Sequence, residues 1–216
     1  FLPEGSGFNP DGTFTEVGVI NYNQDALGAG AEMGVFRDPT FPDKPLPGIP
    51  GTTQSTDHIA LQARTYLELK TGLYRFGVNS DDGFRVTAES APQDLLRSTL
   101  IAGQFNADRA QATTLFYVLA PEDGFYPFEL LFWETGGGAE VEFFSVDLAT
   151  GANILVNDRA EPRSIKAYRS AVARPSVTSI SPVPDSTGVL VTTNITITLV
   201  DGATQVAPSS VQLALN

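Results

Sequence analysis

The sequence predicts an all-β protein: an antiparallel β-sandwich with long loops, followed by a partial immunoglobulin-like β segment. Three observations support this prediction. Apolar and polar residues alternate with a period of two in several segments, clusters of Gly, Asp and Pro separate these segments, and strong helical stripes are missing. The 216 residues are 42% hydrophobic and include 20 Gly and 15 Pro. Such a chain can bury a core but makes many turns.

The first strongly alternating segment is 58–69, where Ile59, Leu61, Leu67 and Leu69 share one face. This pattern is typical of a strand with one buried side. Further strands are expected at 73–79, 84–89, 113–120, 125–134, 139–148 and 153–157. Short connections rich in Gly and Asp join them, which favours an antiparallel sandwich.

Helical structure is expected to be scarce, with short turns at 91–98 and 107–112 as the only candidates. Residues 38–56 contain five Pro and few core candidates. We predict that they form a long ordered loop, and such loops often border binding sites.

The composition changes at Arg174-Pro175, after which charged residues become rare. We therefore expect two domains, a sandwich over 1–172 and a partial immunoglobulin-like segment over 173–216. Because an immunoglobulin-like sandwich needs about seven strands in about 100 residues, the second segment is expected to be its opening part, continued in a parent protein. Strands are predicted at 177–180, 189–200 and 211–215.

An incomplete sheet has an unpaired edge and an apolar face. We predict that the C-terminal segment either docks on the sandwich or pairs with a strand of another molecule, with 189–200 as the main ladder. Pairing of the second kind would produce self-association, because main-chain hydrogen bonds add a strand without regard to side-chain identity.

Charge and composition exclude several classes of function. Lys and Arg total 13 against 25 Asp and Glu, for a net charge of −12, so a nucleic-acid partner is not expected. The absence of Cys removes disulfides and thiolate metal sites, and a single His, His58, leaves little zinc chemistry. No segment supplies the ~18 consecutive apolar residues of a membrane-spanning helix.

Three motifs occur in a fixed order: the turn Ser80-Asp81-Asp82-Gly83, the strand entry Gly124-Phe125-Tyr126-Pro127, and the loop Gly136-Gly137-Gly138-Ala139. With the segments around them, over about 15–160, the sequence resembles the anthrax-protective-antigen-type domain family. The resemblance implies a β-sandwich module of the kind found in bacterial adhesins, yeast flocculins, toxins and glycosidases. The lectin members of this family bind sugars through a calcium ion that paired aspartates hold. The C-terminal segment resembles a bacterial immunoglobulin-like stalk repeat.

The paired carboxylates of Asp81 and Asp82 fit a calcium site on physical grounds as well. Adjacent carboxylates on a tight turn repel one another, and Ca²⁺, which takes about 6 to 8 oxygen ligands, is one of few partners that makes the pair favourable. Zinc would require nitrogen or sulfur donors. The alternative is a plain turn in which the Asp side chains accept hydrogen bonds from backbone amides.

The glycine loop is the second candidate part of the site. Gly accepts positive φ without strain, so the backbone of Gly136, Gly137 and Gly138 can approach an ion, although such a run also suits an ordinary hairpin turn. The resemblance implies that this loop lies beside the aspartate turn, that carbonyls of Gly136 and Gly137 complete the calcium site, and that Gly137 and Gly138 border the sugar together with the aspartates. The related flocculins add a side-chain donor from this loop, and the nearest donors here are Glu134 and Thr135.

Two aromatic residues are candidates for sugar contacts. Phe84, which follows the aspartate turn, is predicted to lie at the rim of the carbohydrate site. Trp133 is predicted to lie in or near the core, because the strand from 128 to 133 is apolar on both faces.

No catalytic residues are expected. Asp81 and Asp82 are adjacent and cannot lie on both sides of a glycosidic bond, and a lone His58 at a strand start is typical of a surface or capping residue. The sequence therefore predicts a calcium-dependent carbohydrate-binding module of a secreted or cell-surface bacterial adhesin. Its partners would be glycans on cell surfaces or extracellular polysaccharide. The alternatives are a structural or protein-interaction module without sugar binding, and an accessory insert of a glycosidase.

Overall fold

The computed structural model describes residues 14–24, 34–37, 43–47, 57–89, 100–169, 176–183 and 186–200. The chain divides into two compact units, Phe1–Ser170 and Ala171–Asn216. The division lies close to the break in composition at Arg174-Pro175.

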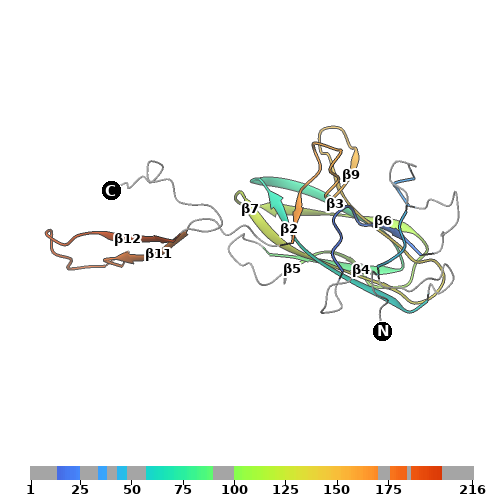
Figure 1. Ribbon diagram of the computed structural model, residues 1–216, viewed down its shortest axis with the longest axis horizontal. Coiled ribbons are helices and arrows are strands. Elements are labelled where there is room, and N and C mark those ends of the chain that lie inside the picture. Colours follow the sequence, from blue (N-terminus) through green and yellow to red (C-terminus); the bar gives the residue numbers. More distant parts are fainter. Residues whose placement is uncertain are drawn as a thin grey trace. The chain divides into compact units, whose positions relative to one another are not determined.

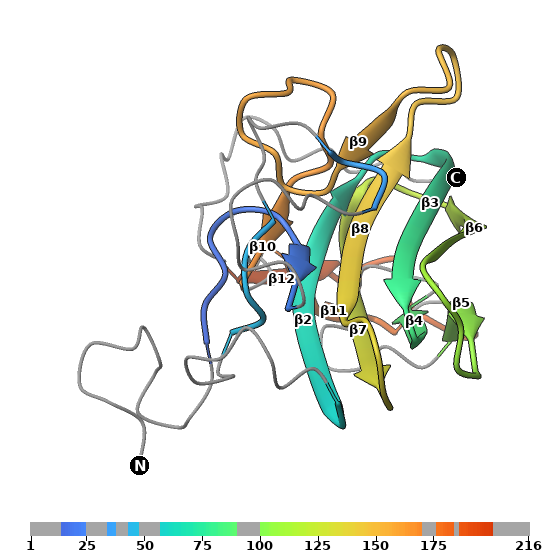
Figure 2. The ribbon, with the colours of Figure 1, turned by 90° about the vertical axis from the view of Figure 1, so that its right-hand side faces the viewer.

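The first unit contains two five-stranded antiparallel sheets (Figures 1 and 2). The first sheet has the order β1 (Asn21–Asn23), β8 (Glu140–Val146), β3 (Gly72–Asp81) and β6 (Ala112–Ala120), with β9 (Asn153–Leu155) also paired to β8. The second sheet has the order β10 (Ala167–Tyr168), β2 (Ile59–Leu69), β7 (Gly124–Glu134), β4 (Gly83–Ala88) and β5 (Leu100–Phe105). The prediction of an all-β antiparallel sandwich is confirmed.

Every strand predicted between residues 58 and 157 is present, with ends that shift by a few residues. The pattern did not reveal β1, β5 and β10, because β1 and β10 are very short and β5 carries no regular alternation. Residues 107–111 are not helical and lead directly into β6, while the predicted turn at 91–98 lies outside the described residues. In the part of the chain that the structure describes, no helix could span a membrane.

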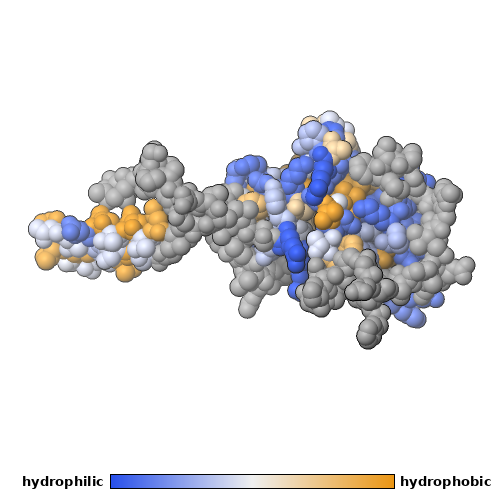
Figure 3. Space-filling view, in the orientation of Figure 1, coloured by the Kyte–Doolittle hydropathy of each residue, from blue (hydrophilic) through white to orange (hydrophobic). Residues whose placement is uncertain are grey.

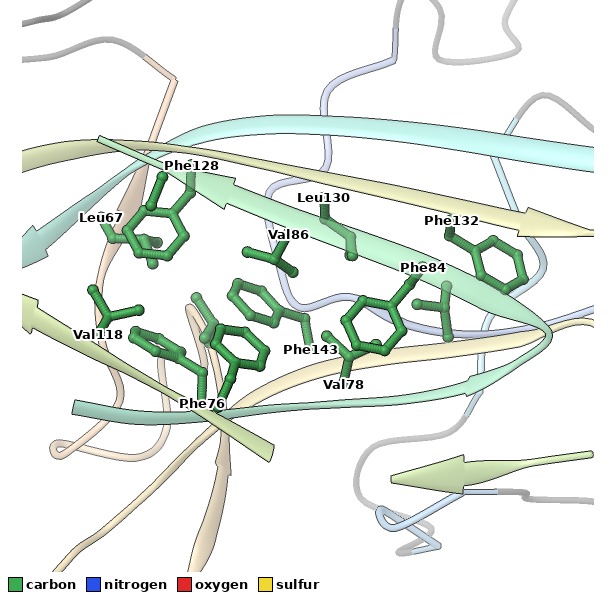
Figure 4. Close-up of a cluster of buried hydrophobic side chains, with 14 of the residues drawn as sticks. Leu67, Phe76, Val78, Phe84, Val86, Val118, Phe128, Leu130, Phe132 and Phe143 are labelled. Carbon is green, nitrogen blue, oxygen red and sulfur yellow. The ribbon is translucent and has the colours of Figure 1, made fainter. Parts of the chain in front are cut away.

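The core lies between the two sheets and is rich in Phe (Figure 4). Phe76 of β3 is fully buried at its centre, with ring centroids 6.0 Å from Phe116, 5.6 Å from Phe128 and 5.7 Å from Phe143. These rings come from both sheets. Their packing therefore fixes the two layers against each other.

A buried carboxylate on the outer side of the first sheet holds a separate segment in place. Glu142 of β8 accepts hydrogen bonds from the backbone N–H groups of Val35 (2.9 Å) and Phe36 (2.9 Å). Gly34 has a φ of +84°, and a Cβ atom there would lie 2.1 Å from Glu142 Oε1. Only Gly fits this approach. Burial raises the pKa of Glu142 to about 7, with repulsion from Asp43 adding to the rise, although the two N–H donors oppose it.

The second unit contains a two-stranded antiparallel sheet of β11 (Ser176–Ser181) and β12 (Thr196–Val200). The predicted ladder over 189–200 is shorter than expected, since only its last five residues form a strand. Ile180, Leu190, Ile197 and Leu199 are exposed on this unit, where Figure 3 shows apolar residues at the surface. Residues 211–215 lie outside the described chain. The immunoglobulin-like assignment and self-association stay predictions.

We expect Phe76→Ala to lower the free energy of unfolding by about 3 to 5 kcal/mol, because it leaves a cavity at the centre of the core. Urea denaturation of the full chain measures this loss. Leu119→Ala, which truncates an exposed side chain on neighbouring β6, should change stability by no more than about 0.5 kcal/mol. Equal losses in the two variants would contradict the central role of Phe76.

We also expect Glu142 to make stability depend on pH. Its folded pKa of about 7 exceeds the ordinary value of 4.5, so the folded chain holds this proton more tightly than the unfolded chain. The free energy of unfolding therefore falls as pH rises from about 4.5 to about 7. Glu142→Gln removes this contribution, and relative to the parent it should gain at most about 3 kcal/mol between pH 5 and pH 8.

Denaturation in EDTA at several pH values tests this dependence. Glu122→Gln is the matched control, because the Glu122 side chain is exposed. A difference between Glu142→Gln and the parent that stays constant with pH would show that Glu142 does not carry the effect.

Candidate metal centre

Three carboxylates converge where strands of both sheets end. Strand β3 ends at Asp81, Asp82 connects β3 to β4, and β7 ends at Glu134. The β4–β7 ladder pairs Gly83 with Trp133, which brings the residue before Gly83 next to the residue after Trp133. Asp81, Asp82 and Glu134 each offer one oxygen, and these three oxygens lie within 4.8 Å of one another. The peptide bond between Asp81 and Asp82 is cis.

The glycine loop lies beside the aspartate turn, as the resemblance implied. Thr135 donates to Asp82 Oδ2 from its backbone N–H (3.1 Å) and from its hydroxyl (2.7 Å). Asp82 Oδ1 accepts the backbone N–H of Arg109 (2.7 Å). Asp82 thus accepts hydrogen bonds from backbone amides, as the plain-turn interpretation predicted, and it also points toward the other carboxylates.

A segment that carries no recognisable motif supplies further contacts. Gln111 donates its backbone N–H to Asp81 Oδ2 (3.2 Å). The Arg109 guanidinium donates to the Ser80 carbonyl (3.1 Å) and hydroxyl (2.7 Å) and lies 4.3 Å above the Phe105 ring. Sequence reasoning missed Arg109 and Gln111. Their role depends on the path of the chain between β5 and β6, for which the sequence gives no signal.

Glu134 is the residue whose environment points most directly to a ligand. It is 1% exposed. Its Oε1 accepts the Gly136 N–H at 2.6 Å, whereas its Oε2 is buried and has no hydrogen-bond donor within the described chain. A proton on this oxygen, a bound water or a cation would satisfy it. The sequence identified Glu134 as a nearby donor but did not predict it as a ligand.

The pKa values of Glu134 and Asp82 are shifted in opposite directions. Burial raises the pKa of Glu134 to about 8, and the neighbouring Asp82 and Asp81 add to the rise because a proton is shared and like charges repel. Burial also acts on Asp82, but the hydrogen bonds from Thr135 and Arg109 outweigh it and lower its pKa. Without a cation the cluster therefore favours one retained proton on Glu134.

The donor set of this cluster fits calcium. All three side chains offer carboxylate oxygens, which hard cations prefer, and no nitrogen or sulfur ligand is among them. The buried Glu134 Oε2, which lacks a donor, is the kind of atom that a cation would satisfy. The arrangement could hold a metal ion.

The other predicted site residues are the glycines of the loop and the aromatic residue Phe84. Gly136 and Gly137 are exposed beside the cluster, and Gly137, with a φ of +105°, donates its N–H to Asp57 Oδ1 at 3.1 Å. Coordination by the carbonyls of Gly136 and Gly137, and a sugar contact at Gly138, stay predictions.

The predictions for the two aromatic residues are wrong. Phe84 is 0% exposed and points into the core beside Val78 (Figure 4), so it cannot border a sugar. The alternation along β4 sends Phe84 inward and Arg85 outward. Trp133 is half-buried on the outer face of its sheet and is not part of the core.

A scan against protein-family models finds no match, and neither does a search of curated proteins. The similar solved structures include the PA14 domain of the MpAFP antifreeze protein (TM-score 0.40, 17% identity, 50% of each chain covered). They also include the PA14 sugar-binding domain from an RTX adhesin (TM-score 0.38, 20% identity, 53% of each chain). A third is the Epithelial Adhesin 9 A domain of Candida glabrata in complex with Galb1-4GlcNAc (TM-score 0.42, 15% identity, 67% of this chain and 70% of that one).

This chain thus spans about half the length of the first two structures. Both are PA14 domains, the family that the ordered motifs of this chain resemble.

Proposed function

We propose that this chain is a calcium-dependent carbohydrate-binding module of a secreted or cell-surface adhesin. The observation that carries this proposal is the convergence of Asp81, Asp82 and Glu134, with a buried Glu134 oxygen that lacks a donor. The ordered sequence motifs, which resemble a family with calcium-dependent lectin members, support the assignment of a sugar as the ligand.

In this proposal each residue has a separate task. Asp81, Asp82 and Glu134 hold the ion, while Thr135 and Arg109 orient the Asp82 carboxylate through their hydrogen bonds. Bound calcium would supply a positive charge and coordination positions that sugar hydroxyls can fill. Residues 135–137, next to the cluster, are exposed, so a glycan can reach this loop.

Binding is favoured over catalysis by the same geometry. A glycosidase places two carboxyl groups about 5 to 9.5 Å apart on either side of the scissile bond. The three carboxylate oxygens here lie within 4.8 Å of one another and leave no room for a sugar between them. We therefore propose a module without catalytic residues.

We expect calcium to stabilise the chain. At a calcium concentration about 100 times Kd, the gain is about 2.7 kcal/mol, or roughly 5 to 10 °C in Tm. Differential scanning calorimetry in EDTA and after calcium addition measures the shift. It should shrink strongly in Asp82→Asn and in Glu134→Gln, and persist in Glu122→Gln, an exposed carboxylate outside the cluster. The same shift in all variants would place the ion elsewhere, and no shift in the parent would refute the metal site.

We expect the intact chain to bind glycans on an array in calcium and to lose this binding in EDTA. Asp81→Asn and Asp82→Asn should lose it as well, because they remove ligand charge from the proposed ion. A blank array for protein that binds calcium would contradict the carbohydrate assignment. That outcome would favour a structural or protein-interaction module with the same metal centre.

A further inference from the structure

A second candidate ligand site lies on the outer face of the sheet that contains β4, β5 and β7. A hollow of about 290 Å³ is lined there by Arg85, Gln104, Asn106, Leu131 and Trp133. The ladders explain why these residues meet. Arg85 of β4 pairs with Leu131 of β7 on one side and with Gln104 of β5 on the other.

The indole of Trp133 lies across the sheet at this place. Trp133 pairs with Gly83 on β4 and with Ala60 on β2, so both of its neighbours across the strands are small. A Cβ atom on Gly83 would lie 2.3 Å from the indole ring. The ring therefore packs directly on the Gly83 backbone, and Trp133 also lines the hollow. Glycine at position 83 is what permits this orientation.

The other lining side chains supply hydrogen-bonding groups. Arg85, Gln104 and Asn106 are exposed, and within the described residues none of the three hydrogen-bonds to another. Together they offer amide and guanidinium donors and two amide acceptors beside the indole. Nearby Glu129 forms an ion pair with Arg64 at 2.8 Å. Burial acts to raise the pKa of Glu129, but the hydrogen bonds from Gln62 and Arg64 and the charges of Arg64 and Arg85 outweigh it and lower that pKa.

A pyranose ring matches this combination of groups. One face of such a ring presents C–H groups, which favour the electron-rich face of an indole, while hydroxyls around the ring take up donors and acceptors. The net charge of −12 disfavours an acidic sugar.

We propose that the hollow beside Trp133 is a second carbohydrate-binding site, which takes a neutral pyranose of a polysaccharide without calcium. It is separate from the metal centre, because successive residues of a strand face opposite sides. Trp133 lies on the outer face, whereas the next residue, Glu134, is buried in the acidic cluster. This site does not depend on the calcium-dependent function proposed above.

The test uses the full chain in EDTA, so that the metal centre cannot contribute. Native gels cast with laminarin, mannan, galactan or xylan, and with alginate as an acidic comparison, report binding as retarded migration. Trp133 is the single Trp of the chain, so its fluorescence should change with the polysaccharide that retards the protein. We expect at least one neutral polysaccharide to give both signals.

Variants identify the surface. Trp133→Ala and Arg85→Gln should each weaken this binding about tenfold or more, since truncation of a central Trp or Arg anchor commonly has this effect. Tyr117→Ala is the matched control, because Tyr117 is an aromatic residue 57% exposed on β6 of the other sheet. Circular dichroism checks that each variant is folded, and Gln104→Ala replaces Trp133→Ala if the latter fails to fold.

Several outcomes would overturn the proposal. In EDTA, these are no retardation by any neutral polysaccharide, and retardation by alginate alone. Binding that survives in both Trp133→Ala and Arg85→Gln would also overturn it. So would binding that is seen with calcium but is lost in EDTA. The last result would assign sugar binding to the metal centre and leave the first proposal intact. If calcium does not raise the Tm of the chain but polysaccharide binding persists in EDTA, the metal centre is refuted and this site stands.

Discussion

The ladder between β4 and β7 is the interaction on which both candidate sites depend. Its register pairs Gly83 with Trp133. On the inner side and at the strand ends, this register puts Asp82 beside Glu134, and on the outer side it puts the indole on the Gly83 backbone. A shift by one residue would reverse the facing of every side chain on one strand. It would separate the carboxylates and turn Trp133 inward.

Hydrogen bonds from the backbone make this crowded arrangement of carboxylates possible. Asp82 accepts two of them, from the N–H groups of Thr135 and Arg109, and it accepts a third hydrogen bond from the Thr135 hydroxyl. Together they stabilise its charge in a buried position. Glu134 accepts one and keeps a buried oxygen that lacks a donor. The two acids therefore differ in pKa: the hydrogen bonds favour an ionised Asp82, whereas burial and the neighbouring aspartates favour a protonated Glu134. In the proposed metal centre, a cation would replace that proton.

The sequence predicted the sandwich because alternation and turn chemistry are local properties. It also predicted Asp81 and Asp82 as a pair and the glycine loop as their neighbour, through motifs that resemble a known family. It did not predict Glu134 as a ligand candidate, because a strand-end Glu becomes special only when β7 lies next to the aspartate turn. Arg109 and Gln111 were missed for the same reason, since their contacts span about 30 residues of sequence.

The sequence pattern alone did not predict correctly whether the side chains of Phe84 and Trp133 are buried in the core. Proximity in sequence to the aspartate turn suggested that Phe84 lies at the rim, but the strand begins at Gly83 and its alternation sends Phe84 into the core. An apolar run suggested a core position for Trp133, yet the outer face of β7 is only half-buried. The core position of Phe84 and the outer position of Trp133 have one cause. The turn at Asp82 decides which side chains of β4 face the core, and the register with β7 then decides which side chains of β7 do. The buried Phe84 anchors the start of β4, which begins at Gly83 directly after Asp82. The rigidity of that anchor is what preorganises the acidic cluster at the turn and the indole over the sheet.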